Sequence, residues 1–239
     1  MRLLVTRPHP EAVGTAAALA ALGHAVMFAP MLETVLLPPP GTLEPPAAVL
    51  FTSANAVRAV SAWPPAMLKR EIAAFAVGDR TAAMAVEAGF TSVQSAEGDS
   101  GALAALVEAK LEPAAGPLLY PTIARPAGEL AGRLESVGFS IAMIEAYRMN
   151  AASALQPEVA AALAAGEIEG VLLYSRRTTK TFIQLAEPLR PHLAALMFYC
   201  LSPDIAAPLD YGRIRVAARP TEAALLEMLR SGTEVTGIR

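Results

Sequence analysis

The chain of 239 residues has little charge, a single cysteine and no long apolar run. Only 17% of its residues are charged and 54% are hydrophobic, whereas soluble proteins carry roughly 25% charged residues. The mean hydropathy is accordingly high, at +0.42. The longest apolar run, residues 193–201, is much shorter than the ~20 residues of a membrane-spanning helix. We therefore expect a globular protein that has no contact with a membrane.

The sequence also lacks the features of several other classes of protein, namely disulfide-bonded, metal-binding, nucleic-acid-binding and secreted proteins. Cys200 cannot form an internal disulfide and lies in an apolar run, so we expect a buried thiol in a reducing, cytoplasmic compartment. The three histidines, His9, His24 and His192, are isolated, and no ligand spacing for a metal occurs. A net charge of −3 leaves no basic stripe for nucleic acid. Residues 1–6 do not resemble the start of a signal peptide, which also favours a cytoplasmic location.

Short apolar segments alternate with alanine-rich helical segments along the chain. The predicted strands are 2–6, 25–30, 48–52, 73–77, 91–94, 117–122, 141–149, 170–174, 196–201 and 214–217. The predicted helices are 11–22, 54–62, 80–88, 101–111, 127–137, 157–165, 178–186 and 221–229. Residues 36–46 contain five prolines and a glycine, which predicts a linker. The alternation predicts parallel sheets with helices on both faces, and strands buried on both faces explain the high hydropathy.

An internal repeat indicates how these elements are divided. Residues 49–53 match residues 171–175, since each is a strand that ends in serine and enters a helix. The second copy stops when the chain ends, before its last two strands. The start of the chain supplies them, because residues 3–8 match residues 118–126 as a strand followed by Arg-Pro.

We therefore predict an α/β protein of two Rossmann/flavodoxin-like parallel-sheet lobes, of which one is discontinuous. The discontinuous domain comprises residues 1–35 and 151–239, and the inserted domain comprises residues 42–149. The two linkers, 36–41 and 150–153, would lie side by side as a two-strand hinge.

Ligands of open parallel sheets bind beyond the carboxyl ends of the strands, where helix N-termini present free N–H groups. The residues expected there are Thr6, Arg7, Thr52, Ser53, Ala54, Asn55, Gly78, Thr81, Arg125, Tyr147, Arg148, Ser175, Arg176 and Ser202. Hydroxyls, backbone amides and arginine forks suit carboxylate or phosphate groups. The pattern predicts an anionic ligand held between the two lobes.

Most of these residues also allow a purely structural interpretation. Ser53 and Ser175 stand where helix N-caps occur, and Gly78 stands where a tight turn would need glycine. Arg7 and Arg125, each followed by proline, could be solvated charges at the edge of a sheet. No phosphate loop, dinucleotide fingerprint or nucleophile elbow is present, so the sequence offers no basis for nucleotide-driven or nucleophilic catalysis.

Five segments resemble the uroporphyrinogen-III synthase family, in the same order and over nearly the whole chain. They are LVTRP (4–8), FTSANAV (51–57), AVGDRTA (76–82), EAYR (145–148) and PTEAALL (220–226). The resemblance implies a two-lobed α/β fold and an enzyme that needs no cofactor. It also implies a hydro-lyase of tetrapyrrole and heme biosynthesis. Such an enzyme cyclises the linear tetrapyrrole hydroxymethylbilane to uroporphyrinogen III, inverting the last pyrrole ring as water is lost.

The resemblance also suggests roles for individual residues. Tyr147 matches the tyrosine of the family's Tyr-Arg strand end and is the candidate general acid, although an ordinary half-buried tyrosine stays an alternative. Thr81 matches the threonine of the first Gly-x-x-Thr, and Ser53 and Ser175 match the two strand-end serines. The chain departs from the pattern at residues 202–205, where Ser202 replaces glycine and Pro203 lacks an N–H group.

The expected partner is hydroxymethylbilane, whose eight carboxylates suit the arginines, hydroxyls and amides at the strand ends. We expect a monomer, with a transient contact to the preceding enzyme of the pathway as an open question. Two other interpretations remain at this point. A two-lobed protein could close on a small anion without chemistry, or the altered turn at residues 202–205 could mark a catalytically silent member of the family.

Overall fold

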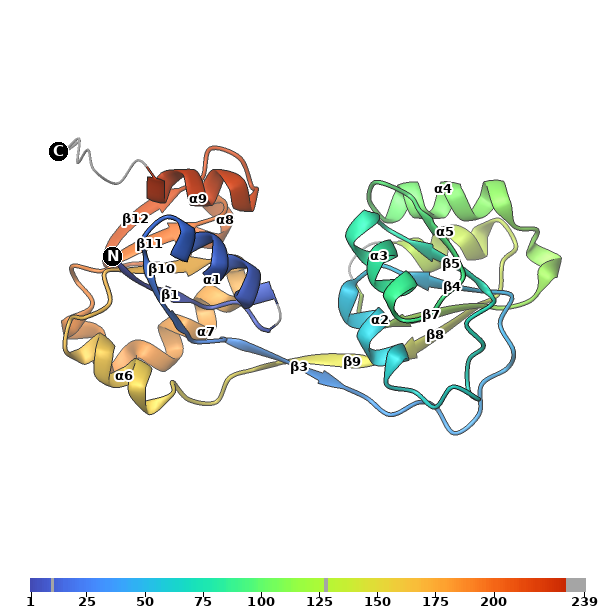
Figure 1. Ribbon diagram of the computed structural model, residues 1–239, viewed down its shortest axis with the longest axis horizontal. Coiled ribbons are helices and arrows are strands. Elements are labelled where there is room, and N and C mark those ends of the chain that lie inside the picture. Colours follow the sequence, from blue (N-terminus) through green and yellow to red (C-terminus); the bar gives the residue numbers. More distant parts are fainter. Residues whose placement is uncertain (10, 127–128, 231–239) are drawn as a thin grey trace. The chain divides into compact units, whose positions relative to one another are not determined.

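A computed structural model describes residues 1–9, 11–126 and 129–230. The chain forms two compact units (Figure 1). Unit 1 contains Met1–Glu33 and Asn150–Arg239, and unit 2 contains Thr34–Met149. Unit 1 is therefore assembled from both ends of the chain, whereas unit 2 is continuous.

Unit 1 is built on a five-stranded parallel sheet. Its strands, in spatial order, are β12 (Arg213–Val216), β11 (Met197–Cys200), β10 (Gly170–Leu173), β1 (Arg2–Val5) and β2 (Ala25–Phe28). The helices that pack on one face are α6 (Pro157–Ala164), α7 (Arg176–Ala186) and α8 (Pro203–Ala206). Those on the other face are α1 (Glu11–Ala21) and α9 (Glu222–Arg230). A 3₁₀ segment, Glu187–His192, follows α7.

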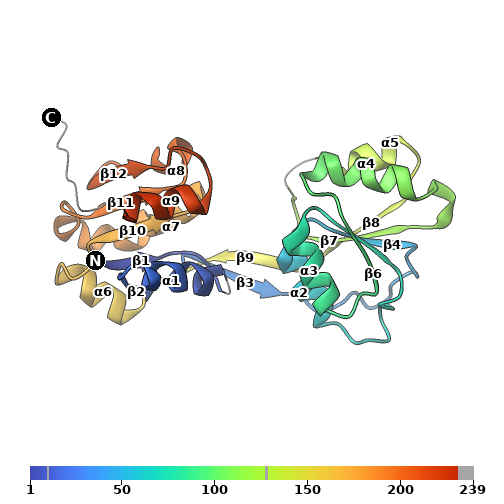
Figure 2. The same ribbon diagram turned by 45° about the horizontal axis from the view of Figure 1, so that its top comes forward.

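Unit 2 repeats this arrangement on a second five-stranded parallel sheet (Figure 2). Its strands, in spatial order, are β6 (Ser92–Ser95), β5 (Ala73–Ala76), β4 (Ala48–Phe51), β7 (Leu118–Thr122) and β8 (Ile141–Glu145). The helices on one face are α2 (Ala54–Ser61) and α3 (Asp79–Glu87), and those on the other are α4 (Ser100–Lys110) and α5 (Leu130–Ser136). A 3₁₀ turn, Pro113–Ala115, precedes β7.

The two sheets have the same strand order when the segments matched by the sequence repeat are aligned. Strands β12, β11 and β10 correspond to β6, β5 and β4, and β1 and β2 correspond to β7 and β8. The prediction of an α/β fold with two parallel-sheet lobes is confirmed. The middle strands, β10 and β4, are apolar along their length, because helices cover both faces of each sheet.

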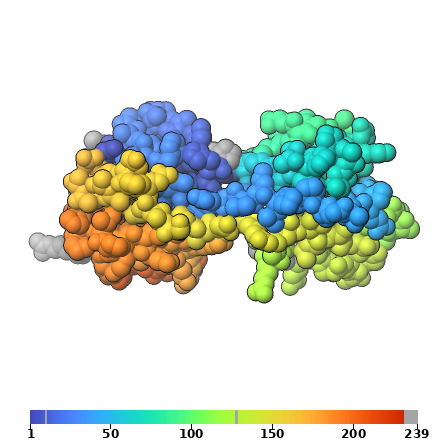
Figure 3. Space-filling view, turned by 90° about the horizontal axis from the view of Figure 1, so that it is seen from below, coloured from blue at the N-terminus to red at the C-terminus, as the bar shows by residue number. Residues whose placement is uncertain are grey.

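A two-stranded ribbon joins the units, formed by β3 (Leu32–Leu36) and β9 (Tyr147–Ala151). The two segments lie side by side in Figure 3, in blue and yellow. Backbone hydrogen bonds beyond its ends run from Leu37 to Ala146 (2.9 Å) and from Ala152 to Met31 (3.0 Å), so the strands are antiparallel.

The ribbon corrects two predictions about local structure. The strand predicted at 141–149 is divided at Ala146, whose N–H donates to the carbonyl of Thr122 while its own carbonyl accepts from Leu37. The chain thus exchanges β7 for β3 as its partner at this residue. Strand β3 was not predicted, and its last residue lies within the predicted linker 36–46. An apolar pattern does not reveal a change of partner strand.

Smaller differences concern the ends of helices. The helix predicted at 127–137 begins at Leu130 in the structure, and residues 127 and 128 lie outside the described part of the chain. A further helix, α8, follows residue 202 and has only four residues. In the described part of the chain, no helix is both long enough and apolar enough to cross a membrane.

Cys200 is fully buried at the end of β11, as predicted from its apolar surroundings. Burial raises the pKa of the thiol to about 12, because the thiolate would lose its hydration. The thiol is consequently protonated near neutral pH, as expected for a cysteine that only packs.

Candidate active site

The clearest polar arrangement in unit 2 lies where β4 ends and β9 begins. The hydroxyl of Tyr147 shares a hydrogen bond of 2.8 Å with the hydroxyl of Ser53. Ser53 also caps helix α2, since its Oγ accepts the backbone N–H of Ala56 at 3.2 Å. The interpretation of Ser53 as a helix N-cap is therefore correct, and its contact with Tyr147 is a further feature that the structure adds.

Tyr147 is almost completely buried, with 7% of its surface exposed. Burial raises the pKa of its phenol above the usual value of 10.0. The hydrogen bond from Ser53 opposes this shift, and the nearby Tyr120 adds to it. Tyr147 therefore keeps its proton at neutral pH, which is the state that a general acid requires.

Tyr120 is a neighbour of this pair that the sequence did not indicate. It lies in β7, is 2% exposed, and its hydroxyl is 3.4 Å from that of Thr52, which directly follows β4. The hydroxyls of Thr52, Ser53 and Tyr120 thus come from two adjacent strands or from the residues that directly follow them. A tyrosine inside an apolar strand gives no sequence signal of a site, because such residues usually serve the core.

The start of helix α2 places Ala54 and Asn55 directly after Ser53. The side-chain carbonyl of Asn55 accepts a hydrogen bond from Arg58, and its amide nitrogen lies 3.8 Å from the sulfur of Met149. Asn55 thus contacts its own helix and β9 in this structure. Ala54 contributes only its backbone to this turn.

Gly78 precedes α3 at the end of β5, the strand next to β4. Its backbone is extended, with φ of −163°, and a Cβ atom built there would meet nothing within 4 Å. The expectation that a tight turn needs glycine here is therefore wrong, since any residue fits. Thr81, in the first turn of α3, is 7% exposed and packs at the same end of the sheet.

The arginines of unit 2 differ in how they are bound. Arg125 follows β7 and has an exposed side chain, and no ion pair of its guanidinium is found among the described residues. Arg148, next to Tyr147, donates two hydrogen bonds to the carboxylate of Glu145, at 2.7 and 2.9 Å. Arg125 is thus an accessible cation near this edge.

The corresponding edge of unit 1 carries Ser175, Arg176 and Ser202. Ser175 caps α7 through the N–H of Thr178 at 3.1 Å and shares a hydrogen bond of 2.8 Å with the hydroxyl of the same residue. Arg176 forms an exposed ion pair of 2.5 Å with Asp204. Ser202 precedes α8 without a side-chain cap bond. No tyrosine hydroxyl contacts Ser175 in the described part of unit 1.

Arg7 is held within unit 1 by several groups. Its guanidinium pairs with Glu222 at 3.0 Å, lies 3.3 Å from the hydroxyl of Thr15, and stacks over the ring of Tyr174 at 4.4 Å. Burial raises the pKa of Tyr174 to about 12, and the charge of Glu222 contributes. Glu222 offsets the charge of Arg7, and the sequence could not indicate this pair because its members lie at opposite ends of the chain.

The predicted residues therefore form two groups, one at the carboxyl edge of each sheet. Those in unit 2 are Ser53, Ala54, Asn55, Gly78, Thr81, Arg125 and Tyr147, and those in unit 1 are Arg7, Ser175, Arg176 and Ser202. Among the described residues, no three His, Cys, Asp or Glu side chains gather closely enough to hold a metal ion. The chemistry available is hydrogen bonding, cationic pairing and proton donation by Tyr147.

A model of the family described as "Uroporphyrinogen-III synthase HemD" matches residues 14–227. The match extends over most of both units.

The chain belongs to the uroporphyrinogen-III synthase family.

A solved structure of a uroporphyrinogen-III synthetase has the same fold. The Helicobacter pylori uroporphyrinogen-III synthetase is 20% identical, with a TM-score of 0.63 over 97% of this chain and 99% of that one. A mutant uroporphyrinogen III synthase from Thermus thermophilus is 17% identical, with a TM-score of 0.48 over 97% of both chains. A comparison with curated protein sequences gives no significant match.

Within the uroporphyrinogen-III synthase family, the turn at residues 202–205 is where this chain departs from the expected pattern. Pro203 begins the short helix α8, and Asp204 is occupied by its ion pair with Arg176. This turn therefore presents fewer free N–H donors than the turn at Gly78, which begins the nine-residue helix α3.

Proposed function

We propose that this chain is a uroporphyrinogen-III synthase, a hydro-lyase that converts hydroxymethylbilane to uroporphyrinogen III in tetrapyrrole and heme biosynthesis. Membership in the family supports the activity. The observation that carries the mechanism is the buried Tyr147, which keeps its proton and is fixed by Ser53 at 2.8 Å.

In the proposed reaction, Tyr147 donates its proton to the hydroxyl of the bilane as the carbon–oxygen bond breaks, so that the hydroxyl leaves as water. The nitrogen of the pyrrole ring that carried this hydroxymethyl group then gives its proton back to Tyr147. The phenol is regenerated, and the ring becomes an azafulvene. Closure through a spiro intermediate then inverts the last ring. The protein's main task is to hold the chain ends in position, because the azafulvene is already reactive.

We further propose that the two edges bind the carboxylates of the substrate. In unit 2 these contacts come from Arg125 and the backbone around Ala54, Asn55 and Gly78, with Thr81 beside them. In unit 1 they come from Arg7, Ser175, Arg176 and Ser202. The backbone conformation at position 78 does not require glycine, and this supports the proposal. The absence of a side chain there lets a ligand approach the backbone closely. Arg7 and Arg176 would have to exchange Glu222 and Asp204 for substrate carboxylates.

We propose that the protein works as a monomer in the cytoplasm on hydroxymethylbilane, without a cofactor. The buried, protonated thiol of Cys200 is compatible with a reducing compartment.

The test is to incubate the purified protein with hydroxymethylbilane, oxidise the products and separate the isomers. We expect mainly the type III isomer, whereas a control without protein gives the type I isomer of spontaneous closure. If the protein also yields only type I, the proposed activity is wrong. Binding of the bilane without any change of product would then identify a catalytically silent anion-binding member of the family.

A further inference from the structure

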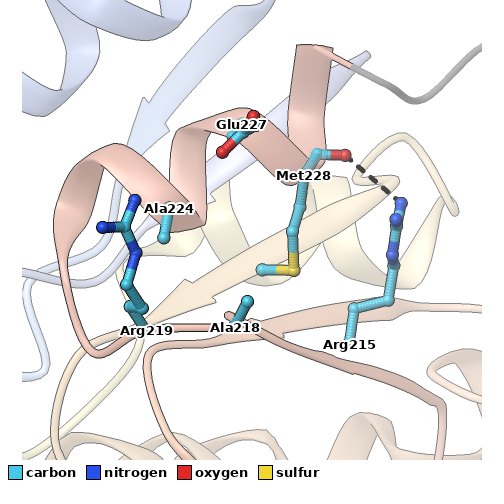
Figure 4. Close-up of a pocket in the computed structure, with 6 residues that line it drawn as sticks. All are labelled: Arg215, Ala218, Arg219, Ala224, Glu227 and Met228. Carbon is cyan, nitrogen blue, oxygen red and sulfur yellow. Dashed lines mark hydrogen bonds between the residues drawn. The ribbon is translucent and has the colours of Figure 1, made fainter.

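A pocket of unit 1 lies between strand β12 and helix α9, and none of its lining residues belongs to the candidate active site (Figure 4). Its volume is about 320 Å³, within the range of small-ligand pockets. It is lined by Arg215, Ala218, Arg219, Ala224, Glu227 and Met228. β12 is the outermost strand of its sheet, so the pocket opens at the sheet's edge.

Two of the lining residues are cationic, and they are bound differently. Arg215 donates a hydrogen bond of 3.2 Å to the backbone carbonyl of Met228, which fixes it against the last turn of α9. Arg219 follows β12 in the loop that enters α9 and is exposed. No hydrogen bond or ion pair of its guanidinium is found within residues 1–9, 11–126 and 129–230. Arg219 therefore offers a free fork of N–H donors.

The surface between the two arginines is apolar. In Figure 4 the side chain of Met228 extends from α9 toward the strand and lies beside Ala218, with Ala224 closer to Arg219. A flexible thioether adapts its shape to varied apolar groups. The acidic Glu227 leaves the lining with two positive charges and one negative charge.

We propose that this pocket binds a monocarboxylate that carries a short apolar chain. The carboxylate forms a bidentate pair with Arg219, and the apolar chain packs on Met228, Ala218 and Ala224. A single acidic group matches the net charge of the lining, whereas Glu227 repels a second one. Two sources provide this chemistry: a carboxylate arm of the substrate proposed above, or a free short-chain acid.

The test uses the full chain labelled with ¹³C at its methionine methyl groups, with Met228→Leu to assign the signal of interest. The probe is 3-phenylpropionate, and the control ligand is its neutral analogue 3-phenylpropanamide. We expect a saturable shift of the Met228 methyl signal with the acid alone. Arg219→Gln should weaken this binding by about tenfold, since a lost charged hydrogen bond corresponds to roughly that factor.

Arg213→Gln is the matched control, because Arg213 is exposed on the same strand and does not line the pocket. It should leave the affinity unchanged, and Glu227→Gln should increase it. Equal shifts with acid and amide, or an unchanged affinity in Arg219→Gln, would overturn the proposal.

The source of the carboxylate follows from a second measurement on the same variants. A KM for hydroxymethylbilane that rises in Arg219→Gln and not in Arg213→Gln identifies a substrate arm. An unchanged KM, together with weakened binding of the probe, identifies a free acid. This assignment rests on the proposed function, but the titration does not. The experiments therefore distinguish a failure of the proposed synthase activity from a failure of the proposed carboxylate binding.

Discussion

At the scale of single residues, Tyr147 and Arg7 differ in what their neighbours allow them to do. The phenol of Tyr147 is buried and hydrogen bonded to Ser53, so it remains a proton donor. The guanidinium of Arg7 is already paired with Glu222 and stacked on Tyr174. Of these two residues, one is thus suited to proton donation and the other must first release an internal partner.

Replacing Tyr147 with phenylalanine should lower kcat roughly 10²-fold or more, the usual contribution of a general acid, while KM changes little. Steady-state assays of type III product measure both constants. Tyr211→Phe is the control, because its buried hydroxyl has no hydrogen-bond partner in the described part of the chain. Unchanged turnover in Tyr147→Phe would remove this residue from the acid role.

The pH dependence of the wild-type enzyme follows from the same phenol. Burial raises the pKa of Tyr147 above 10.0, and the acid role that we propose for it requires the protonated phenol. The phenol is therefore protonated near neutral pH, and its active fraction is lost only as the pH rises through the elevated pKa. Rates measured between about pH 6 and about pH 9 should show no alkaline fall due to this residue. A fall of the enzymatic kcat near pH 8 that Tyr147→Phe abolishes would contradict the assignment.

Gly78→Ala tests whether the backbone at this turn approaches a ligand. The added methyl group meets nothing within 4 Å, so the free energy of unfolding should change by less than about 1 kcal/mol. KM for the bilane should rise, because the methyl group covers the backbone that we propose as a binding surface. Gly212→Ala is the contrasting variant. Its φ is +75° and its Cβ would lie 2.6 Å from Phe198, so it should unfold at much lower urea concentration.

At the scale of elements, the matched helices α2 and α7 begin with equivalent serine caps that have different second partners. Ser53 caps α2 and also contacts Tyr147. In the described part of the chain, the side chain of Ser175 caps α7 and hydrogen bonds only to Thr178 of the same helix. The two repeats therefore allow a serine cap that is hydrogen bonded to a tyrosine to be compared with an equivalent cap that is not.

Ser53→Ala and Ser175→Ala should each lower the free energy of unfolding by about 1 kcal/mol through loss of the cap. Ser53→Ala should cost roughly a further 1 kcal/mol, since the buried Tyr147 hydroxyl loses its partner. Urea unfolding measures both values. Equal losses would show that the bond between Ser53 and Tyr147 contributes nothing to stability.

The elements themselves were largely predictable. Helices and central strands have their own apolar periods, so α2, α3, β4 and β10 occur within one or two residues of the predicted ranges. The failures, β3 and the division at Ala146, occur where hydrogen-bond partners change rather than where the side-chain pattern changes.

At the scale of the whole molecule, each unit encloses its own core. In unit 2, two separate apolar clusters cover the two faces of one sheet, and every strand of that sheet lies within Thr34–Met149. Neither cluster contains a residue of unit 1.

Residues 34–149, expressed alone, should therefore fold into the same parallel sheet. We expect a cooperative urea transition and the circular dichroism of an α/β protein, with the full chain as reference. Residues 1–33 alone should stay unfolded, because their two strands lack β10 as a neighbour. A gradual, non-cooperative loss of signal from the 34–149 fragment would show that unit 2 depends on unit 1.

The sequence by itself determined the α/β class, the repeated order of strands and helices, and the residues that follow each strand. These properties depend on local periodicity and on chain order, which are written in the sequence. Only the tertiary structure decided that Ser53 contacts Tyr147, that Tyr120 stands nearby, and that Glu222 neutralises Arg7. Such contacts join residues far apart in the chain, and their energies depend on burial and distance, which no local pattern contains.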